Sequence, residues 1–156
     1  MAATFNTIGE EAKKRGVRFA YHNHGYGWVE KNGQRPMDII FNETDPSTVF
    51  FEMDVFWTAA AGVDIIACLN NHANRYHLMH LKDMKEAVRF KTNGEDSREW
   101  FSLFPAITSC GNGVLNLKEI VKTAQKNGVK HFFVEQDIAP QPRVSLQQSH
   151  HYLDQI

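Results

Sequence analysis

The stretch KKRGVRFAYHNH, residues 13–24, decides the fold class because it runs from a helix end through a glycine into a strand. The segment QKNGVKHFF, residues 125–133, repeats the order of helix, glycine, valine, basic residue and strand. Gly16 is a natural stop for the first helix, and this order is the joint of an αβ unit. The weak internal repeat therefore predicts an α/β fold.

Alternating helices and strands extend this unit along the chain. Strands are expected at 17–24, 49–57, 75–83 and 131–137. Helices are expected at 5–15, 36–43, 63–72, from a capping box of Asn116 and Glu119 to Gly128, and at 144–154, with an irregular charged segment at 85–100. This alternation predicts parallel (β/α) units with right-handed crossovers. No linker divides residues 1–156, so a single domain is expected.

Composition and charge are those of a soluble globular protein. The chain has 156 residues, of which 42% are hydrophobic and 22% charged, and its formal net charge is −1. This balance argues against a nucleic-acid partner or an anionic lipid surface. No apolar run approaches a membrane span, and the N-terminus lacks the apolar core of a signal peptide. Cys68 and Cys110 are expected to be free thiols, so a cytoplasmic location is predicted.

Each expected strand is apolar until its carboxyl part, where ionisable residues occur two positions apart. The pairs are His22 with His24, Glu52 with Asp54, His80 with Lys82, and Glu135 with Asp137. Residues two apart in a strand point to the same face, and parallel α/β folds form their sites at the carboxyl ends of strands. Buried ionisable groups must be paired or metal-bound, so this pattern predicts a shared metal-binding or polar site.

The residue types of this set suit a divalent metal. One or two imidazoles with two or three carboxylates and no cysteine are compatible with Mn²⁺, Mg²⁺, Co²⁺ or Zn²⁺. A second glycine-containing motif, GNG at 111–113, is read as a plain turn rather than a phosphate-binding loop, because a lone Gly-x-Gly is a weak signal.

Structural roles remain open for some charged residues near the strand ends. Glu52 could pair with Lys82 or with Arg18 inside the fold. Asp83 and Asp137 could cap loops or pair with lysines instead of binding a ligand.

Several segments, in order, resemble the sugar phosphate isomerase/epimerase family, the xylose-isomerase-like TIM barrels. They are NTIGEEAKKRGVRFAYHNHGY, NETDPSTVFFEMDVFWTAAAGVD, RYHLMHLKDM and GVKHFFVEQD. The resemblance covers nearly the whole chain. It implies an eight-stranded (β/α) barrel with a divalent metal at its C-terminal mouth.

The family's metal ligands come from the last four strands, as Glu, Asp, His and Glu. The residues of this chain that match the last three are Asp54, His80 and Glu135. The first ligand is expected on the YHNH strand, where relatives often read HNH-x-x-E-F and this chain has Gly27 in the place of the acid. His24 and Glu30 are the possible replacements.

The resemblance also implies the chemistry, which is aldose–ketose isomerisation or epimerisation of a sugar or sugar phosphate through an enediolate. Glu135 would be both ligand and catalytic base, with His24 as a possible partner in proton transfer. The residues expected to contact substrate are His22, His24, Trp57 and Lys82.

The length of the chain matches only part of such a barrel, because a whole barrel needs about 250 residues. The chain is expected to be a half-barrel, formed from the last four strands. Half a barrel leaves two edge strands and the inner face of the sheet open. The chain is therefore expected to form a homo-oligomer or to pair with a partner half-barrel.

Two other functions compete with a metal-dependent isomerase. A catalytically impaired half-barrel that binds sugar or metal, or serves as an assembly subunit, is favoured by Gly27 and by the missing strands. A metal-dependent nuclease shares the barrel, but the balanced charge argues against nucleic acid.

Overall fold

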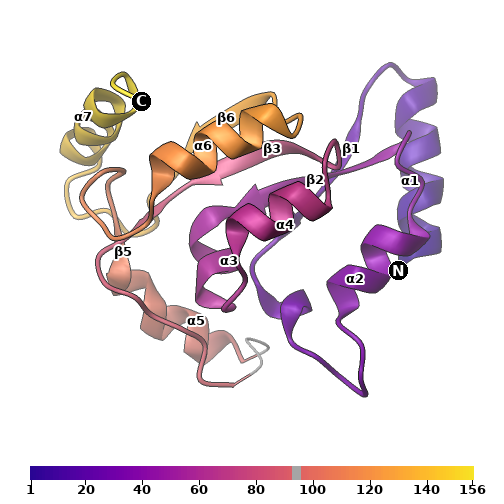
Figure 1. Ribbon diagram of the computed structural model, residues 1–156, viewed down its shortest axis with the longest axis horizontal. Helices are drawn as coiled ribbons and strands as arrows, with labels where there is room; N and C mark the ends of the chain where they lie inside the picture. The colour runs from indigo at the N-terminus through magenta and orange to yellow at the C-terminus, as the bar shows by residue number, and fades with distance from the viewer. Residues whose placement is uncertain (93–95) are drawn as a thin grey trace.

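A four-stranded parallel sheet is the centre of the structure (Figure 1). The computed structural model describes residues 1–92 and 96–156. The strands are β1 (Phe19–Asn23), β2 (Val49–Asp54), β3 (Tyr76–Leu81) and β6 (His131–Val134), in the order β1-β2-β3-β6. All three neighbouring pairs are parallel, so their carboxyl ends meet at one end of the sheet. The α/β fold expected from the sequence is confirmed.

Helices precede, connect and follow the strands. They are α1 (Ala2–Lys14), α2 (Pro36–Glu43), α3 (Val55–Ala60), α4 (Ile65–Asn71), α5 (Ser97–Leu103), α6 (Leu117–Lys126) and α7 (Pro142–Leu153). Two 3-10 turns, η1 (Tyr26–Trp28) and η2 (Phe104–Ala106), and a small antiparallel pair, β4 (Asp83–Met84) with β5 (Ile107–Thr108), complete the described elements. Helices α4 and α6 lie side by side over one face of the sheet (Figure 1).

The repeat seen in the sequence is a repeat of structure at two helix ends. The amide of Val17 donates to the carbonyl of Ala12 after α1, at 3.1 Å, and the amide of Val129 donates to that of Ala124 after α6, at 3.0 Å. The glycine before each valine has a positive φ, 73° at Gly16 and 97° at Gly128. Glycine adopts this left-handed conformation without steric cost, which ends the helix and turns the chain into the next strand.

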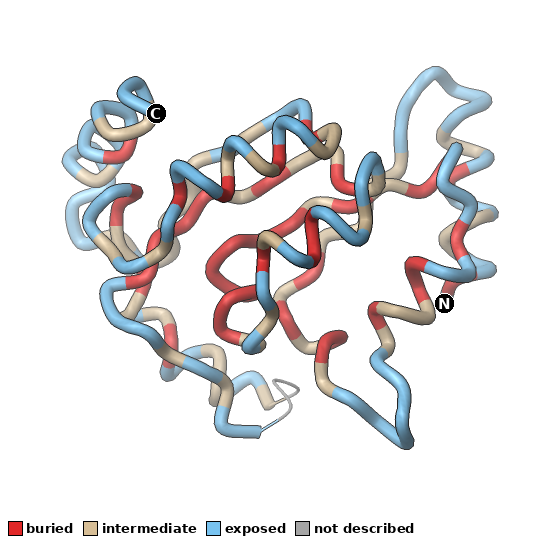
Figure 2. Tube along the Cα trace, in the orientation of Figure 1, coloured by how far each residue is buried: buried red, intermediate tan, exposed pale blue. Residues whose placement is uncertain are grey.

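The hydrophobic core lies between the sheet and these helices. Figure 2 shows the buried stretches along β2, along β3 and throughout α3. The buried strand side chains that face this core include Val49, Phe51, Met53, Met79 and Leu81. Side chains of the opposite face are less covered, and Phe133 on β6 is 45% exposed. The sheet therefore has one apolar, covered face and one open face.

Two expected strands end earlier than the sequence analysis placed them. The strand expected at 49–57 stops at Asp54, because Asp54 Oδ1 accepts the backbone N–H of Trp57 at 3.0 Å and caps α3. Trp57 is therefore helical. The strand expected at 131–137 stops at Val134, so Glu135 and Asp137 lie in the loop that follows β6.

The segment 85–100, expected to be irregular, ends in a helix, so that expectation was wrong for its last residues. Helix α5 begins at Ser97, and Asp96 caps it by accepting the backbone N–H of Arg98 at 2.9 Å. Residues 93–95 of that segment lie outside the described residues. The strand expected at 75–83 also divides, because Asp83–Met84 leaves the parallel sheet and pairs antiparallel with β5.

Two other expectations concern the cysteines and membranes. Cys68 and Cys110 are free and buried, as expected, and burial raises the pKa of each thiol to about 11. Within residues 1–92 and 96–156, no helix combines the length and apolar character needed to cross a membrane.

Candidate metal centre and active site

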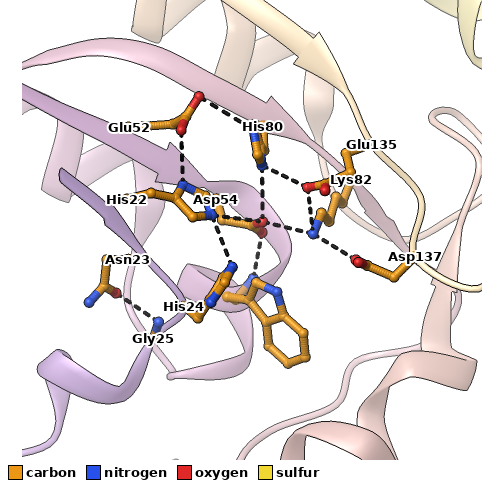
Figure 3. Close-up of polar contacts among 11 residues, drawn as sticks. His22, Asn23, His24, Gly25, Glu52, Asp54, His80, Lys82, Glu135 and Asp137 are labelled. Carbon is orange, nitrogen blue, oxygen red and sulfur yellow. Dashed lines mark hydrogen bonds and ion pairs between the residues drawn. The ribbon is translucent and has the colours of Figure 1, made fainter. Parts of the chain in front are cut away.

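Polar side chains from β1, β2 and β3, and from the loops that follow β1, β3 and β6, converge at the carboxyl end of the sheet (Figure 3). The strand register causes this, because His22 lies opposite Glu52 and Asp54 lies opposite His80. The loops that leave β1, β3 and β6 add the remaining members. The residues brought together are His22, His24, Glu52, Asp54, His80, Lys82, Glu135 and Asp137.

Three of these side chains form a ligand set for a cation. His22, Asp54 and His80 each offer one ligand atom, and these atoms all lie within 4.8 Å of one another. Asp54 Oδ2 and His80 Nδ1 are buried and have no aligned hydrogen bond, although Asp54 Oδ2 lies 3.0 Å from the Lys82 ammonium. The ring nitrogen of His80 is therefore the atom whose burial a bound cation would offset most. Two imidazole nitrogens and a carboxylate oxygen therefore fit a divalent cation such as Zn²⁺, Mn²⁺ or Co²⁺.

Glu135 lies at the border of this ligand set. Its Oε2 atom is 2.7 Å from His80 Nδ1 and 2.9 Å from Lys82 Nζ. Burial disfavours its ionised form, but the hydrogen bond and charge of Lys82 outweigh that, so the pKa of Glu135 is lowered. Its side chain is 42% exposed, so a substrate could reach it.

Lys82 is a buried cation held by three carboxylates. Its ammonium lies 3.0 Å from Asp54 Oδ2, 2.9 Å from Glu135 Oε2 and 2.7 Å from Asp137 Oδ2. Burial alone would lower the pKa of Lys82, but these carboxylates raise it above its ordinary value. Lys82 therefore stays positively charged at neutral pH. The lysine pairing that the sequence left open for Asp137 is present.

His24 lies beside the ligand set rather than within it. Its Nε2 atom is 3.0 Å from the Nε2 atom of His22, so one ring donates a hydrogen bond to the other. Burial, His22 and Lys82 lower the pKa of His24 to about 4. The imidazole is therefore neutral at neutral pH.

The aromatic neighbours of His24 differ from those the sequence indicated. Trp57 is only 2% exposed and stacks on Phe90, so it offers little surface to a substrate. Trp100 on α5 is half-buried, lies 5.6 Å from the His24 ring and stacks on Tyr26. The sequence analysis missed Trp100, although Asp96, followed three residues later by Glu99, is a helix-start signal next to it.

Comparison with known proteins identifies the family of this chain. The sequence profile of the family described as "Xylose isomerase-like TIM barrel" matches residues 1–156. The chain belongs to this family. This confirms the resemblance seen in the sequence motifs.

Relatives of the chain include dehydratases and proteins described as isomerase/epimerases. An inosose dehydratase of Geobacillus thermodenitrificans is 30% identical over 139 residues, which cover 86% of this chain and 46% of that protein. An inosose dehydratase of Lactiplantibacillus plantarum is 30% identical over 156 residues, covering 96% and 51%. A sugar phosphate isomerase/epimerase of Parabacteroides distasonis superimposes with a TM-score of 0.75 and 26% identity, covering 99% of this chain and 52% of that one. The chain thus spans about half the length of these xylose isomerase-like relatives.

Gly27 does not face the ligand set, although the family motif led us to expect an acid at that position. Gly27 is buried in η1, where a Cβ atom would lie 2.8 Å from Met37 Cγ and 3.2 Å from Asn23 Nδ2. A side chain there would point at α2. His22 is the β1 residue that lies with Asp54 in the ligand set, and Glu30 is exposed.

The turn at 111–113 is held by the buried carboxylate of Asp83. Asp83 Oδ2 accepts the backbone N–H groups of Gly111 at 2.9 Å and Gly113 at 3.0 Å, while Oδ1 accepts those of Met84 and Leu115. These amides are already satisfied, so the turn offers no phosphate site. Asp83 therefore has the loop-capping role that the sequence left open, in this member of the xylose isomerase-like family.

Proposed function

We propose that this chain carries the metal-binding and proton-transfer centre of a sugar or sugar phosphate isomerase or epimerase. The observation that carries the proposal is the convergence of a carboxylate, Glu135, with a cation, Lys82, and the His22–Asp54–His80 ligand set. Relatives are described as inosose dehydratases and as sugar phosphate isomerase/epimerases. Loss of water beside a carbonyl and isomerisation can share a first step, removal of a proton from the adjacent carbon.

A divalent cation would be held by His22, Asp54 and His80, with Glu135 at the border of the set. When bound, it supplies a Lewis acid that stabilises negative charge developing on substrate oxygens. Among the metals considered from the sequence, two nitrogen ligands favour Zn²⁺, Mn²⁺ or Co²⁺ over Mg²⁺.

Glu135 is the proposed base. Lys82 keeps its carboxylate ionised, so Glu135 can accept a proton from the carbon next to the substrate carbonyl. Return of that proton to the former carbonyl carbon, with transfer of the adjacent hydroxyl proton to the former carbonyl oxygen, completes an isomerisation. Epimerisation needs a second proton-transfer group on the other face of the substrate, and His24 is the candidate because its neutral ring can accept a proton there at neutral pH.

Binding of the substrate is assigned to the polar groups around the base. His22 and His24 can hydrogen-bond sugar hydroxyls or a phosphate. Lys82, expected from the sequence to contact substrate, is 1% exposed and acts instead through its ion pair with Glu135. Trp100 has more accessible ring surface than Trp57 and is the aromatic side chain proposed to pack on the sugar.

Metal titration and solvent exchange test the proposal. Calorimetry with Zn²⁺ and Mn²⁺ should give one binding site per chain, and a panel of aldose and ketose phosphates in D₂O should show metal-dependent exchange of the proton beside the carbonyl by NMR. Glu135→Gln should abolish the exchange, whereas exposed Glu10→Gln should leave it unchanged. A chain that binds neither cation would contradict the proposal, and exchange retained in Glu135→Gln would remove Glu135 as the base.

We further propose that a second half-barrel completes the fold. Strands β1 and β6 form the two edges of the sheet, and Phe133 is exposed on its open face. Unpaired strand edges and exposed apolar side chains favour association. Light scattering should therefore give the mass of a dimer, and a monodisperse monomer with a cooperative melt would contradict this assignment and favour a small binding module.

A further inference from the structure

One carboxylate lies between the two histidines of the ligand set. Glu52 Oε2 is 3.3 Å from His22 Nδ1, and Glu52 Oε1 is 3.3 Å from His80 Nε2 (Figure 3). Glu52 therefore contacts the two imidazoles instead of Lys82 or Arg18, the partners considered from the sequence. Its side chain is only 17% exposed, so water competes little with these contacts.

The opposite edges of the two rings converge on a second carboxylate. Asp54 Oδ2 lies 4.0 Å from His22 Nε2 and 3.8 Å from His80 Nδ1. The rings are neighbours, with centroids 4.5 Å apart. Each imidazole is thus flanked by Glu52 at one nitrogen and by Asp54 at the other.

The nitrogen that faces Glu52 differs between the two histidines. A carboxylate only accepts hydrogen bonds, so each nitrogen facing Glu52 must carry the proton if the contact is favourable. His22 would then be protonated at Nδ1 and His80 at Nε2. A neutral imidazole has one N–H and one lone pair, which leaves the lone pairs on His22 Nε2 and His80 Nδ1.

One further contact agrees with this assignment. His22 Nδ1 is buried without an aligned hydrogen bond, so Glu52 Oε2 at 3.3 Å is a charge contact that the proposed N–H would strengthen. His22 Nε2 lies 3.0 Å from His24 Nε2, and its lone pair can accept the N–H of His24.

We propose that Glu52 is a positioning residue that accepts an N–H from both imidazoles and so selects opposite ligand atoms, Nε2 of His22 and Nδ1 of His80. With its lone pair on Nδ1, His80 faces Glu135 Oε2 at 2.7 Å as one acceptor faces another, and a cation bound there would remove this repulsion. This inference rests on the proposed function, because the ligand atoms have a role only if the set binds a cation. Carboxylates behind metal-binding histidines fix ring orientation and tautomer in this way.

The substitution Glu52→Gln tests the role because it keeps the size but not the symmetry of the carboxylate. The new side-chain amide would have one acceptor oxygen and one donor nitrogen, so it could accept from only one of the two imidazoles. In Glu52→Gln, the Kd for Zn²⁺ should rise about 10- to 100-fold. The exposed control Glu10→Gln should bind Zn²⁺ as the unaltered chain does. A Kd for Glu52→Gln within about threefold of the unaltered value would overturn the inference.

Nitrogen-15 NMR of histidine-labelled protein reports which ring nitrogen carries the proton or binds the metal. A purely structural role of Glu52 would not fix this choice. In the zinc-loaded chain, the spectra should show ligation through Nε2 of His22 and Nδ1 of His80, and ligation through the same-named nitrogen of both would overturn the proposal. In the metal-free chain, His22 should carry its proton on Nδ1, and a proton on Nε2 would overturn the proposal. The measurement on the metal-free chain tests the role of Glu52 even if no cation binds, and it needs no variant to fold. Failure to bind a cation would reject the proposed function but would leave this measurement valid.

Discussion

The ammonium of Lys82 lies 3.0 Å from Asp54 Oδ2, which pairs a base that follows β3 with an acid at the end of β2. Both residues are almost fully buried. A buried pair of this kind contributes little by itself, but the loss of one partner leaves an uncompensated charge. The stability of the carboxyl end of the sheet therefore depends on Lys82.

Lys82→Met should destabilise the fold by about 3–5 kcal/mol at neutral pH, because Asp54, Glu135 and Asp137 lose their shared cation. Lys82 lowers the pKa of Glu135 in the folded chain, so that contribution is present above the ordinary value of 4.5 and is lost as the pH falls. The destabilisation should therefore be smaller in acid. Urea unfolding at two pH values measures it, with exposed Lys122→Met as control, and equal effects of the two variants would contradict the prediction.

His24→Gln should weaken the pH dependence of stability. The pKa of His24 is lowered from 6.5 to about 4, so the unfolded chain binds this proton at higher pH than the folded chain does. The contribution is complete above pH 6.5 and is lost as the pH falls toward 4. The drop in unfolding free energy across this range should be smaller by about 1–2 kcal/mol in His24→Gln. His151→Gln, at an exposed histidine, should keep the unaltered profile, and a similar flattening in both would argue against His24 as the source.

Gly27→Glu should not complete the metal site. A Cβ atom at this buried position would lie 2.8 Å from Met37 Cγ, so the larger side chain must displace α2 or leave the turn. We expect a lower melting temperature and no gain in affinity for Zn²⁺, measured by thermal unfolding and calorimetry. Gly27→Ala separates the steric effect from the charge. Tighter Zn²⁺ binding in Gly27→Glu would show that position 27 does reach the ligand set.

Asp83→Asn should loosen the turn at 111–113. Asparagine keeps one acceptor oxygen and turns its amide donor toward backbone N–H groups that Asp83 now satisfies. Leaving such buried donors unpaired should cost about 3 kcal/mol, measured by urea unfolding. Asp154→Asn, at an exposed position, is the control, and a similarly small effect of both changes would show that Asp83 does not organise the turn.

The arrangement of the strands, and with it much of the site, could be predicted from sequence. The helix-glycine-strand joints at Gly16 and Gly128 are local signals, and parallel neighbours bring their carboxyl ends together whatever the register. The convergence of His22 with Asp54 and His80 then follows from the polar ends of adjacent strands.

Details that depend on competition between local and tertiary contacts could not be predicted. Asp54 is a candidate ligand and a helix cap at once, and only the fold shows that the strand ends there and that Trp57 is buried. Trp100 comes from α5, far along the chain, and no sequence period links it to His24. The contacts of Glu52 with two imidazoles depend on side-chain directions across three strands.

The order of strands in the sheet has a consequence for protein synthesis. The sheet runs β1-β2-β3-β6 in the same order as the chain, and His22, Asp54 and His80 all lie on the first three of these strands. Glu135 and Asp137 follow only after α6 and β6. The ribosome therefore synthesises the three candidate ligands before the proposed base, Glu135. Lys82 contacts three carboxylates in the folded chain, and until β6 docks only one of these, Asp54, is in place.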